Sequence, residues 1–139
     1  MFKKINLQFL ISYFGFLPFL FIIIDKVFFN IFNPLVLKDF TILYAIIIFV
    51  FIGAINWNLK ENISIYLVII GFMPSLCSVF IILLHLLSFD MSAFIIFLLL
   101  LQLVIDNFFY KKIFEKKIYY MIRVPLTFLI VTSLAIIQF

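Results

Sequence analysis

The stretch "LLLLQLVIDNFFYKKIFEKKIYYMIRVPLT", residues 98–127, decides the architecture of this chain. It contains two apolar segments separated by a short lysine-rich run, and each segment carries one ionisable residue, Asp106 before the run and Arg123 after it. Ionisable groups in the hydrocarbon of a bilayer are costly and normally pair with one another. The stretch therefore predicts two membrane helices joined as a hairpin, with an ion pair between Asp106 and Arg123.

The composition of the whole chain agrees with a membrane location. Of the 139 residues, 68% are hydrophobic and 12% are charged, whereas soluble domains are roughly half apolar and one quarter charged. A helix needs about 20 mostly apolar residues to cross a bilayer. The short alternating segments of a transmembrane β-barrel are absent from the sequence. We therefore expect an integral membrane protein whose crossings are helices.

The apolar runs predict an all-α bundle of five transmembrane helices that forms a single domain over residues 1–139. The shortest break is at Asp90, and a four-span alternative would fuse the runs on either side of it. That fused run, residues 63–109, would be about 70 Å of helix, which is two crossings. The segment 25–39 is expected to be a connector in the outer interface of the bilayer. The predicted spans are residues 5–24, 40–57, 63–87, 91–109 and 118–138.

The lysines predict the orientation of the bundle. Basic residues near span ends are retained in the cytoplasm. Five spans place Lys26 and Lys38 on one side, Arg123 inside a span, and the other seven basic residues on the side of the N-terminus. We therefore expect a cytoplasmic N-terminus and an external C-terminus. The basic residues form no stripe suited to nucleic acid, so no nucleic-acid partner is expected.

Further polar residues are predicted to lie at the depth of the ion pair. Gln102 lies four residues before Asp106, on the same face of the helix. The second span ends with Asn56 and Trp57 on the same side of the membrane, after Gly53, whose small size permits close helix packing. The cluster has a structural interpretation, in which it holds helices together, and a functional one, in which it binds a substrate or relays protons. Its candidate members are Asn56, Trp57, Gln102, Asp106 and Arg123.

Catalytic motifs are absent from the sequence. There is no GxSxG, HExxH or phosphate-binding loop, and three glycines cannot build a dinucleotide fingerprint. Cys77 is the single cysteine and His85 the single histidine, which is a poor basis for a metal site. We expect no enzymatic activity, no cofactor and no metal.

Five short motifs together resemble a known family. In order they are "GFLPF", "FIGAINWNL", "YLVIIGFMPSL", "LQLVID" and "IRVPLTFLIVTSL". They resemble the family of the domain of unknown function 3429, which is transmembrane protein 69-like. The resemblance implies a helical, multi-pass protein of a bacterial or mitochondrial inner membrane, without an established activity. The family's second motif has histidine and glycine where this chain has Asn56 and Asn58, so chemistry that needs an imidazole there is not expected.

Three functional classes are compatible with these features. The first is a non-enzymatic accessory or assembly protein of the bacterial inner (cytoplasmic) membrane, which is favoured by small size and short loops. The second is a small transporter or proton-linked channel that uses Asp106. The third, a membrane enzyme acting on lipid, is least supported because no nucleophile and base are visible. The expected partners are the lipid bilayer and either another membrane protein or a second copy of the chain.

Overall fold

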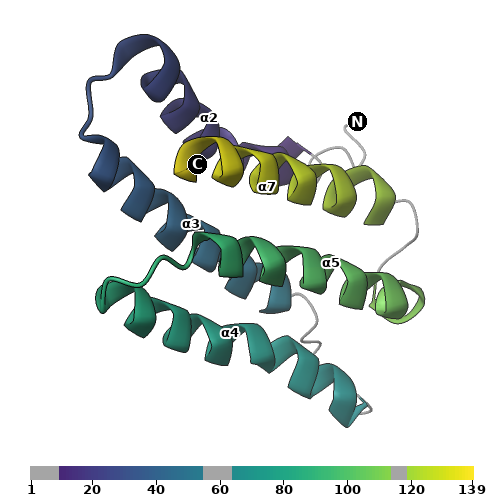
Figure 1. The fold of residues 1–139 in the computed structure, drawn as a ribbon. Helices are drawn as coiled ribbons and strands as arrows, with labels where there is room; N and C mark the ends of the chain where they lie inside the picture. Colours follow the sequence, from purple (N-terminus) through teal and green to yellow (C-terminus); the bar gives the residue numbers. More distant parts are fainter. Residues whose placement is uncertain (1–9, 55–63, 114–118) are drawn as a thin grey trace. The chain divides into compact units, whose positions relative to one another are not determined.

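The computed structural model describes residues 10–54, 64–113 and 119–139, and in them the chain is helical (Figure 1). Two short π-helical segments, η1 (Asp25–Phe29) and η2 (Tyr119–Arg123), adjoin longer helices. The predicted all-α class is confirmed. The described chain includes the α-helices α2 (Leu17–Ile24), α3 (Pro34–Ala54), α4 (Ile65–Leu86), α5 (Ser92–Ile113) and α7 (Val124–Gln138), and residues 10–14 before α2 are α-helical as well.

Four helical segments in the described residues are long and apolar enough to cross a membrane, and a fifth apolar helix, Ser92–Phe108, is shorter. Large apolar side chains such as Phe28 and Phe108 are exposed along them. Helices satisfy their backbone hydrogen bonds internally, so such surfaces are suited to lipid. The chain is a multi-pass membrane protein by the composition of its helices. The four long segments are Leu10–Phe29, Pro34–Ala54, Ile65–Leu86 and Tyr119–Gln138.

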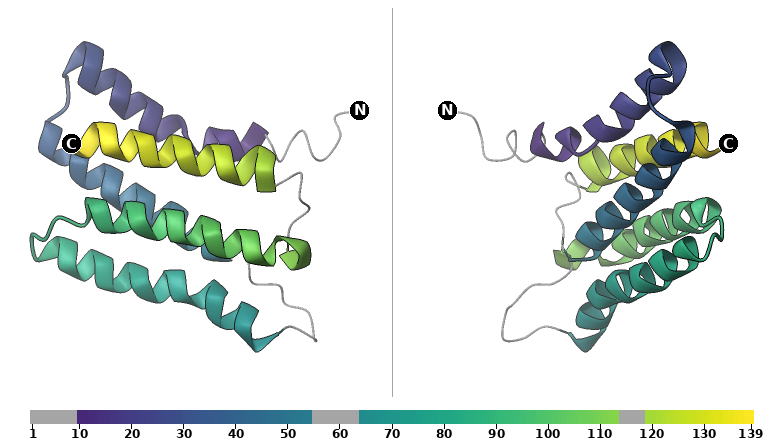
Figure 2. Two further views of the ribbon diagram at one scale, coloured as in Figure 1. Left: turned by 45° about the vertical axis from the view of Figure 1, so that its right-hand side comes forward. Right: turned by 90° about the vertical axis from the view of Figure 1, so that its left-hand side faces the viewer.

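The chain separates into two compact units. One contains residues 1–41 and 103–139, and the other contains residues 42–102. The divisions fall within α3 and α5. In the first unit, α2 lies beside α7 (Figures 1 and 2). In the second unit, α4 and the first part of α5 lie side by side as a hairpin.

The prediction that residues 25–39 form a connector is wrong. The first helix continues as η1 to Phe29, and α3 begins at Pro34, so that residues 30–33 alone join them. Asn33 accepts a hydrogen bond on Oδ1 from the backbone N–H of Leu35 at 2.9 Å. An asparagine cap followed by proline in the first position is a favourable helix start, because proline lacks an N–H that would be unpaired there. The second membrane helix therefore starts six residues before its predicted start at Phe40.

The predicted break at Asp90 is confirmed. After α4, Ser88 adopts a left-handed backbone conformation with φ of 67°. The N–H of Phe89 bonds to the carbonyl of Leu84, and the N–H of Ser88 bonds to that of His85, which is the Schellman pattern that ends helices. Asp90 then accepts a 3.0 Å hydrogen bond from the N–H of Ser92, where α5 begins. This turn separates two helices where the four-span alternative would have had one.

Close packing inside the second unit depends on Gly53. A Cβ atom added there would overlap the ring of Pro74 on α4, so the small residue permits the approach that the sequence predicted. Pro74 is buried within α4, and the hydroxyl of Ser78 donates to its carbonyl at 2.6 Å. Hydroxyls that bond to their own helix leave no unpaired polar group in the apolar surroundings.

Candidate functional site

The predicted ion pair between α5 and the last helix is present. Nη2 of Arg123 donates to Oδ2 of Asp106. Both residues are buried, with 7% of Arg123 and 1% of Asp106 exposed, and both belong to the first unit. Taking either charge out of water is costly unless its partner is in place. The pair therefore fastens α5 to the start of α7.

The local backbone at Arg123 is π-helical, and the reason lies partly in Pro125. Arg123 ends η2, and Pro125 occupies the first turn of α7. In an α-helix the N–H of residue 125 would bond to the carbonyl of Met121, but proline has no N–H. The hydroxyl of Tyr13, from the first helix of the same unit, donates to that carbonyl at 3.0 Å. The irregular start of the last span is therefore held by a side chain more than one hundred residues away.

A second polar contact joins the same two helices. Tyr119 is buried at the start of η2, and its hydroxyl donates to the backbone carbonyl of Leu103 at 2.8 Å. Leu103 lies on α5, about one turn before Asp106. Sequence reasoning missed this tyrosine, although a buried tyrosine hydroxyl normally finds a hydrogen-bond partner. Tyr119, Asp106 and Arg123 form what we call the hairpin cluster.

The remaining candidates of the predicted cluster are placed differently. Gln102 is buried on α5, one turn before Asp106, and belongs to the second unit. Asn56 and Trp57 lie outside the described residues. Thr127, which is outside the five candidates, lies one turn after Arg123 and is buried in α7. The ion pair is thus observed, and the joining of all five candidates into one site stays a prediction.

A second polar region, at the other end of α7, was not predicted. Nζ of Lys26 donates to the carbonyls of Ile136 at 2.6 Å and Ile137 at 3.1 Å. Nζ of Lys38 donates to the carbonyl of Gln138 at 2.9 Å, and Nε2 of Gln138 donates to the carbonyl of Lys38 at 3.0 Å. The last carbonyls of a helix lack intrahelical partners and form the negative end of its dipole. The two lysines therefore cap the C-terminal end of α7 by donating to its last carbonyls.

Asp25 shapes the backbone that positions Lys26. It is 2% exposed, and its carboxylate accepts hydrogen bonds from the N–H groups of Ile31 at 3.2 Å and Phe32 at 3.3 Å. The N–H of Asn30, which has a left-handed φ of 49°, bonds to the carbonyl of Asp25 at 2.7 Å. A buried carboxylate that accepts backbone N–H groups orders the turn between η1 and α3. We call Asp25, Lys26, Lys38 and Gln138 the lysine cluster.

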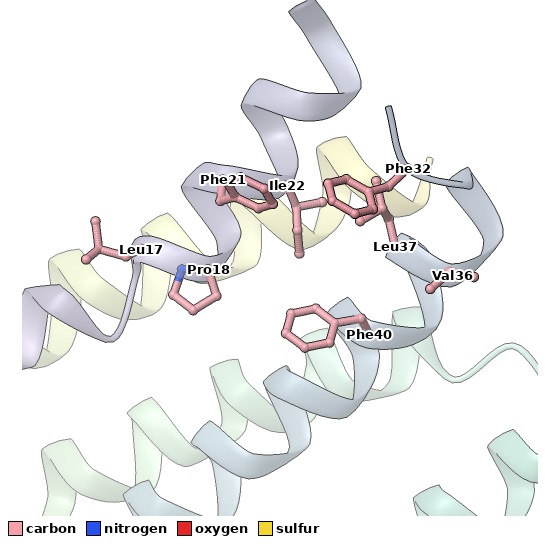
Figure 3. A pocket seen from close by; sticks show the side chains of 8 residues that line it. All are labelled: Leu17, Pro18, Phe21, Ile22, Phe32, Val36, Leu37 and Phe40. Carbon is pink, nitrogen blue, oxygen red and sulfur yellow. The ribbon is translucent and has the colours of Figure 1, made fainter. Parts of the chain in front are cut away.

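An apolar groove lies in the first unit, between α2 and the start of α3 (Figure 3). Its volume is about 460 Å³. Phe40 projects from α3 towards α2, where Pro18 and Ile22 lie, and the rings of Phe21 and Phe32 pack edge to face with centroids 6.0 Å apart. The lining residues are Leu17, Pro18, Phe21, Ile22, Phe32, Val36, Leu37 and Phe40.

A smaller cavity of about 30 Å³ adjoins the groove and reaches the lysine cluster. The groove and this cavity share Ile22, Phe32 and Leu37 in their walls. Asp25, Lys26 and Lys38 supply the charged part of the smaller cavity. Within residues 10–54, 64–113 and 119–139, no group of three or more His, Cys, Asp or Glu side chains is placed to hold a metal ion.

The apolar helices and the buried ion pair define the chain as a multi-pass helical membrane protein. Its residues 6–139 match the model of a family described as protein of unknown function (DUF3429), and the chain belongs to that family. The predicted resemblance is confirmed. No curated protein and no solved structure matches the chain.

Proposed function

We propose that this protein is a non-enzymatic accessory or assembly protein of the bacterial inner membrane, in which the hairpin cluster has a structural role. The observation that supports the proposal most directly is the buried contact between Arg123 and Asp106. The carboxylate of Asp106 already accepts a hydrogen bond from Arg123, so a substrate would have to displace that buried partner to reach it. We therefore assign the pair a structural role, in which it holds two helices together, and not a role in binding or converting a substrate.

The surroundings of the pair support the same role. The hydroxyl of Tyr119 is engaged by the carbonyl of Leu103, and neither the groove nor the cavity beside it includes Asp106 or Arg123 in its walls. A catalytic acid or base has to come within hydrogen-bond reach of a substrate. The guanidinium of Arg123 bonds to Asp106 and the hydroxyl of Tyr119 to the carbonyl of Leu103, so both groups hold the start of the last span against α5.

The accessory role is tested by the state of the protein in native membranes. Membranes are solubilised in a mild detergent, and the full chain is followed by blue-native electrophoresis and by chemical cross-linking before solubilisation. We expect the chain in a discrete assembly larger than itself, with the same cross-linked neighbour in both procedures. Recovery of the chain alone in both procedures contradicts the accessory role.

We further propose that the N-terminus is cytoplasmic and the C-terminus external. The support is the distribution of basic residues, seven on the N-terminal side against Lys26 and Lys38 on the other. Alkaline phosphatase fused after Phe139 should be active, and a fluorescent protein fused there should be dark when exported through the general secretory route. The opposite pair of results contradicts the orientation.

The alternative is a small transporter or proton-linked channel, and the observation that favours it is a buried carboxylate in an apolar helix. The two functions differ in proteoliposomes that contain a pH-sensitive dye. Under the structural role, the wild-type chain and the Asp106→Asn variant produce equal and negligible proton flux. A flux that requires Asp106 and is lost in a folded Asp106→Asn variant supports the transporter instead.

A further inference from the structure

We propose that the apolar groove and the lysine cluster together bind one anionic phospholipid. One acyl chain lies in the groove between α2 and α3, and the phosphate is held by Lys26 and Lys38. This site is distinct from the hairpin cluster, and it adds a ligand to the proposed function without depending on it.

The lysines retain hydrogen-bond donors for a phosphate. An ammonium group has three N–H donors. Lys26 directs its ammonium to the carbonyls of Ile136 and Ile137, and Lys38 directs its own to the carbonyl of Gln138. Within the described residues, one donor of Lys26 and two donors of Lys38 are therefore not used. The bonds to carbonyls also fix both side chains at the end of α7, so that the donors are ordered before a ligand arrives.

The charge of the smaller cavity matches a phosphodiester. Its charged lining residues are Asp25, Lys26 and Lys38, which sum to one positive charge. Neutral carbonyls satisfy N–H groups without cancelling the charge of an ammonium. The carboxylate of Asp25 is directed to the backbone N–H groups of Ile31 and Phe32, and Asp39 is not among the lining residues. One phosphate with a single negative charge would neutralise the cavity.

The groove is suited to the acyl chain of the same molecule. Its walls are entirely apolar, and its volume of about 460 Å³ lies in the range of roughly 300–1,000 Å³ that is typical of ligand pockets. It adjoins the charged cavity, since Ile22, Phe32 and Leu37 line both. Lys26 and Lys38 lie near the ends of two membrane helices, at the level where lipid headgroups meet basic side chains. In a phospholipid the phosphate likewise adjoins the acyl chains, as the charged cavity adjoins the apolar groove.

The site is tested by native mass spectrometry of the full chain. The protein is supplied with equimolar phosphatidylglycerol and phosphatidylcholine that carry the same acyl chains. We expect one phosphatidylglycerol to be retained with a preference of about tenfold, because two lysines favour the anionic headgroup. Equal retention of the two lipids overturns the proposal.

A matched pair of variants tests the groove and leaves both lysines intact. Val36 lines the groove, and Val79 lies on α4 outside it, and the two residues are similarly exposed, at 61% and 56%. Val36→Trp should fill the groove and reduce retention of phosphatidylglycerol at least fivefold, or about 1 kcal/mol. Val79→Trp should leave it unchanged. Equal retention by the two tryptophan variants overturns the assignment of the groove.

The lysines are tested by Lys26→Gln combined with Lys38→Gln, with Lys60→Gln as a control of equal chemistry. In a double variant that is folded by circular dichroism, the preference for phosphatidylglycerol should disappear, and Lys60→Gln should keep it. A preference that persists in the folded double variant contradicts the phosphate site. If the double variant does not fold, the tryptophan pair still decides. A dimer that carries no lipid and is cross-linked near Val36 would show that a second copy of the chain occupies the groove, and would overturn the lipid proposal.

Discussion

The two ends of α7 are held by different kinds of contact. At its start, the charged side chain of Arg123 meets the charged side chain of Asp106, and both are buried. At its end, the charged side chains of Lys26 and Lys38 meet backbone carbonyls. The first contact contains two ionisable residues, each conspicuous in an apolar run. Each lysine contact at the end contains only one ionisable residue, because its acceptor is a main-chain carbonyl that every residue carries.

This difference explains why one end was predicted and the other was not. Asp106 and Arg123 lie at similar distances, five and six residues, from the lysine-rich run that separates their helices, so sequence spacing alone brings them to similar depth. Lys26 is 110 residues from its partner Ile136, and nothing in the sequence of α7 indicates which cation completes it. Loss of a contact should lower the free energy of unfolding more at the start of α7 than at its end, because a deeply buried charge depends on its partner more than a lysine at a helix end does.

The largest effect is expected at the start of α7. Asp106→Ala should lower the free energy of unfolding by about 3–5 kcal/mol, because Arg123 keeps a buried charge without its partner. Unfolding by denaturant in detergent micelles measures the loss. Asn107→Ala, a change of the adjacent exposed residue, should have little effect. Addition of Arg123→Ala to Asp106→Ala should restore part of the stability. A single variant as stable as the wild type would show that the pair does not hold the hairpin.

The buried carboxylate near the other end should rank second. Asp25→Ala should lower the free energy of unfolding by about 1–3 kcal/mol, since the N–H groups of Ile31 and Phe32 lose their acceptor. Asp25→Asn keeps one acceptor oxygen and should lose less. Asp25→Ala is measured under the same conditions as Asp106→Ala, so that the losses at the two ends of α7 can be compared directly. A loss at Asp25 that exceeds the loss at Asp106 would reverse the ranking of the two ends.

Tyr119→Phe should have a smaller effect within the hairpin cluster. It removes the hydroxyl that donates to the carbonyl of Leu103 and keeps the buried ring. A single neutral hydrogen bond contributes about 1 kcal/mol. The loss should appear in the same denaturant titration. Tyr120→Phe, on the exposed neighbour, is the control, and equal effects of the two changes would argue against a specific role for the Tyr119 hydroxyl.

The smallest effect is expected for a single lysine at the end of α7. Lys38→Gln should cost about 0.3–1 kcal/mol, which is the typical contribution of a cation near a helix C-terminus. The effect should shrink as the salt concentration rises, because partly exposed charges are screened. The loss from Asp106→Ala should respond less to salt. An equal salt dependence at both ends would remove the distinction between buried and interfacial contacts.

Much of the fold followed from the apolar runs, and the corrections come from local chemistry. The break at Asp90 was predicted from its charge and from the length of the fused run 63–109, and it is made by the left-handed Ser88 and a carboxylate acceptor. The start of α3 was predicted too late because the polar residues of segment 25–39 suggested a connector. The signal that was available is the pair Asn33 and Pro34, a helix cap followed by a residue suited to the first helical position.

The candidate site was predictable only where side chains pair with side chains. The contacts of Tyr13 with Met121 and of Tyr119 with Leu103 end on carbonyls, and sequence spacing does not distinguish one carbonyl from another. Pro125 gave a partial signal, since it removes the N–H that would serve the Met121 carbonyl in an α-helix. It did not indicate that the donor would come from the first helix.

Contacts at both ends of α7 restrict how that helix can move. A piston-like shift of one turn, about 5.4 Å along its axis, would carry Arg123 away from Asp106 and, in the same step, the carbonyls of Ile136 and Ile137 away from Lys26. Neither contact can be released gradually by sliding, because hydrogen bonds weaken within a fraction of that distance. Within its unit, α7 is therefore held at both ends. A shift of this helix along its axis would require the contact of Arg123 with Asp106 and the contacts of Lys26 to break together.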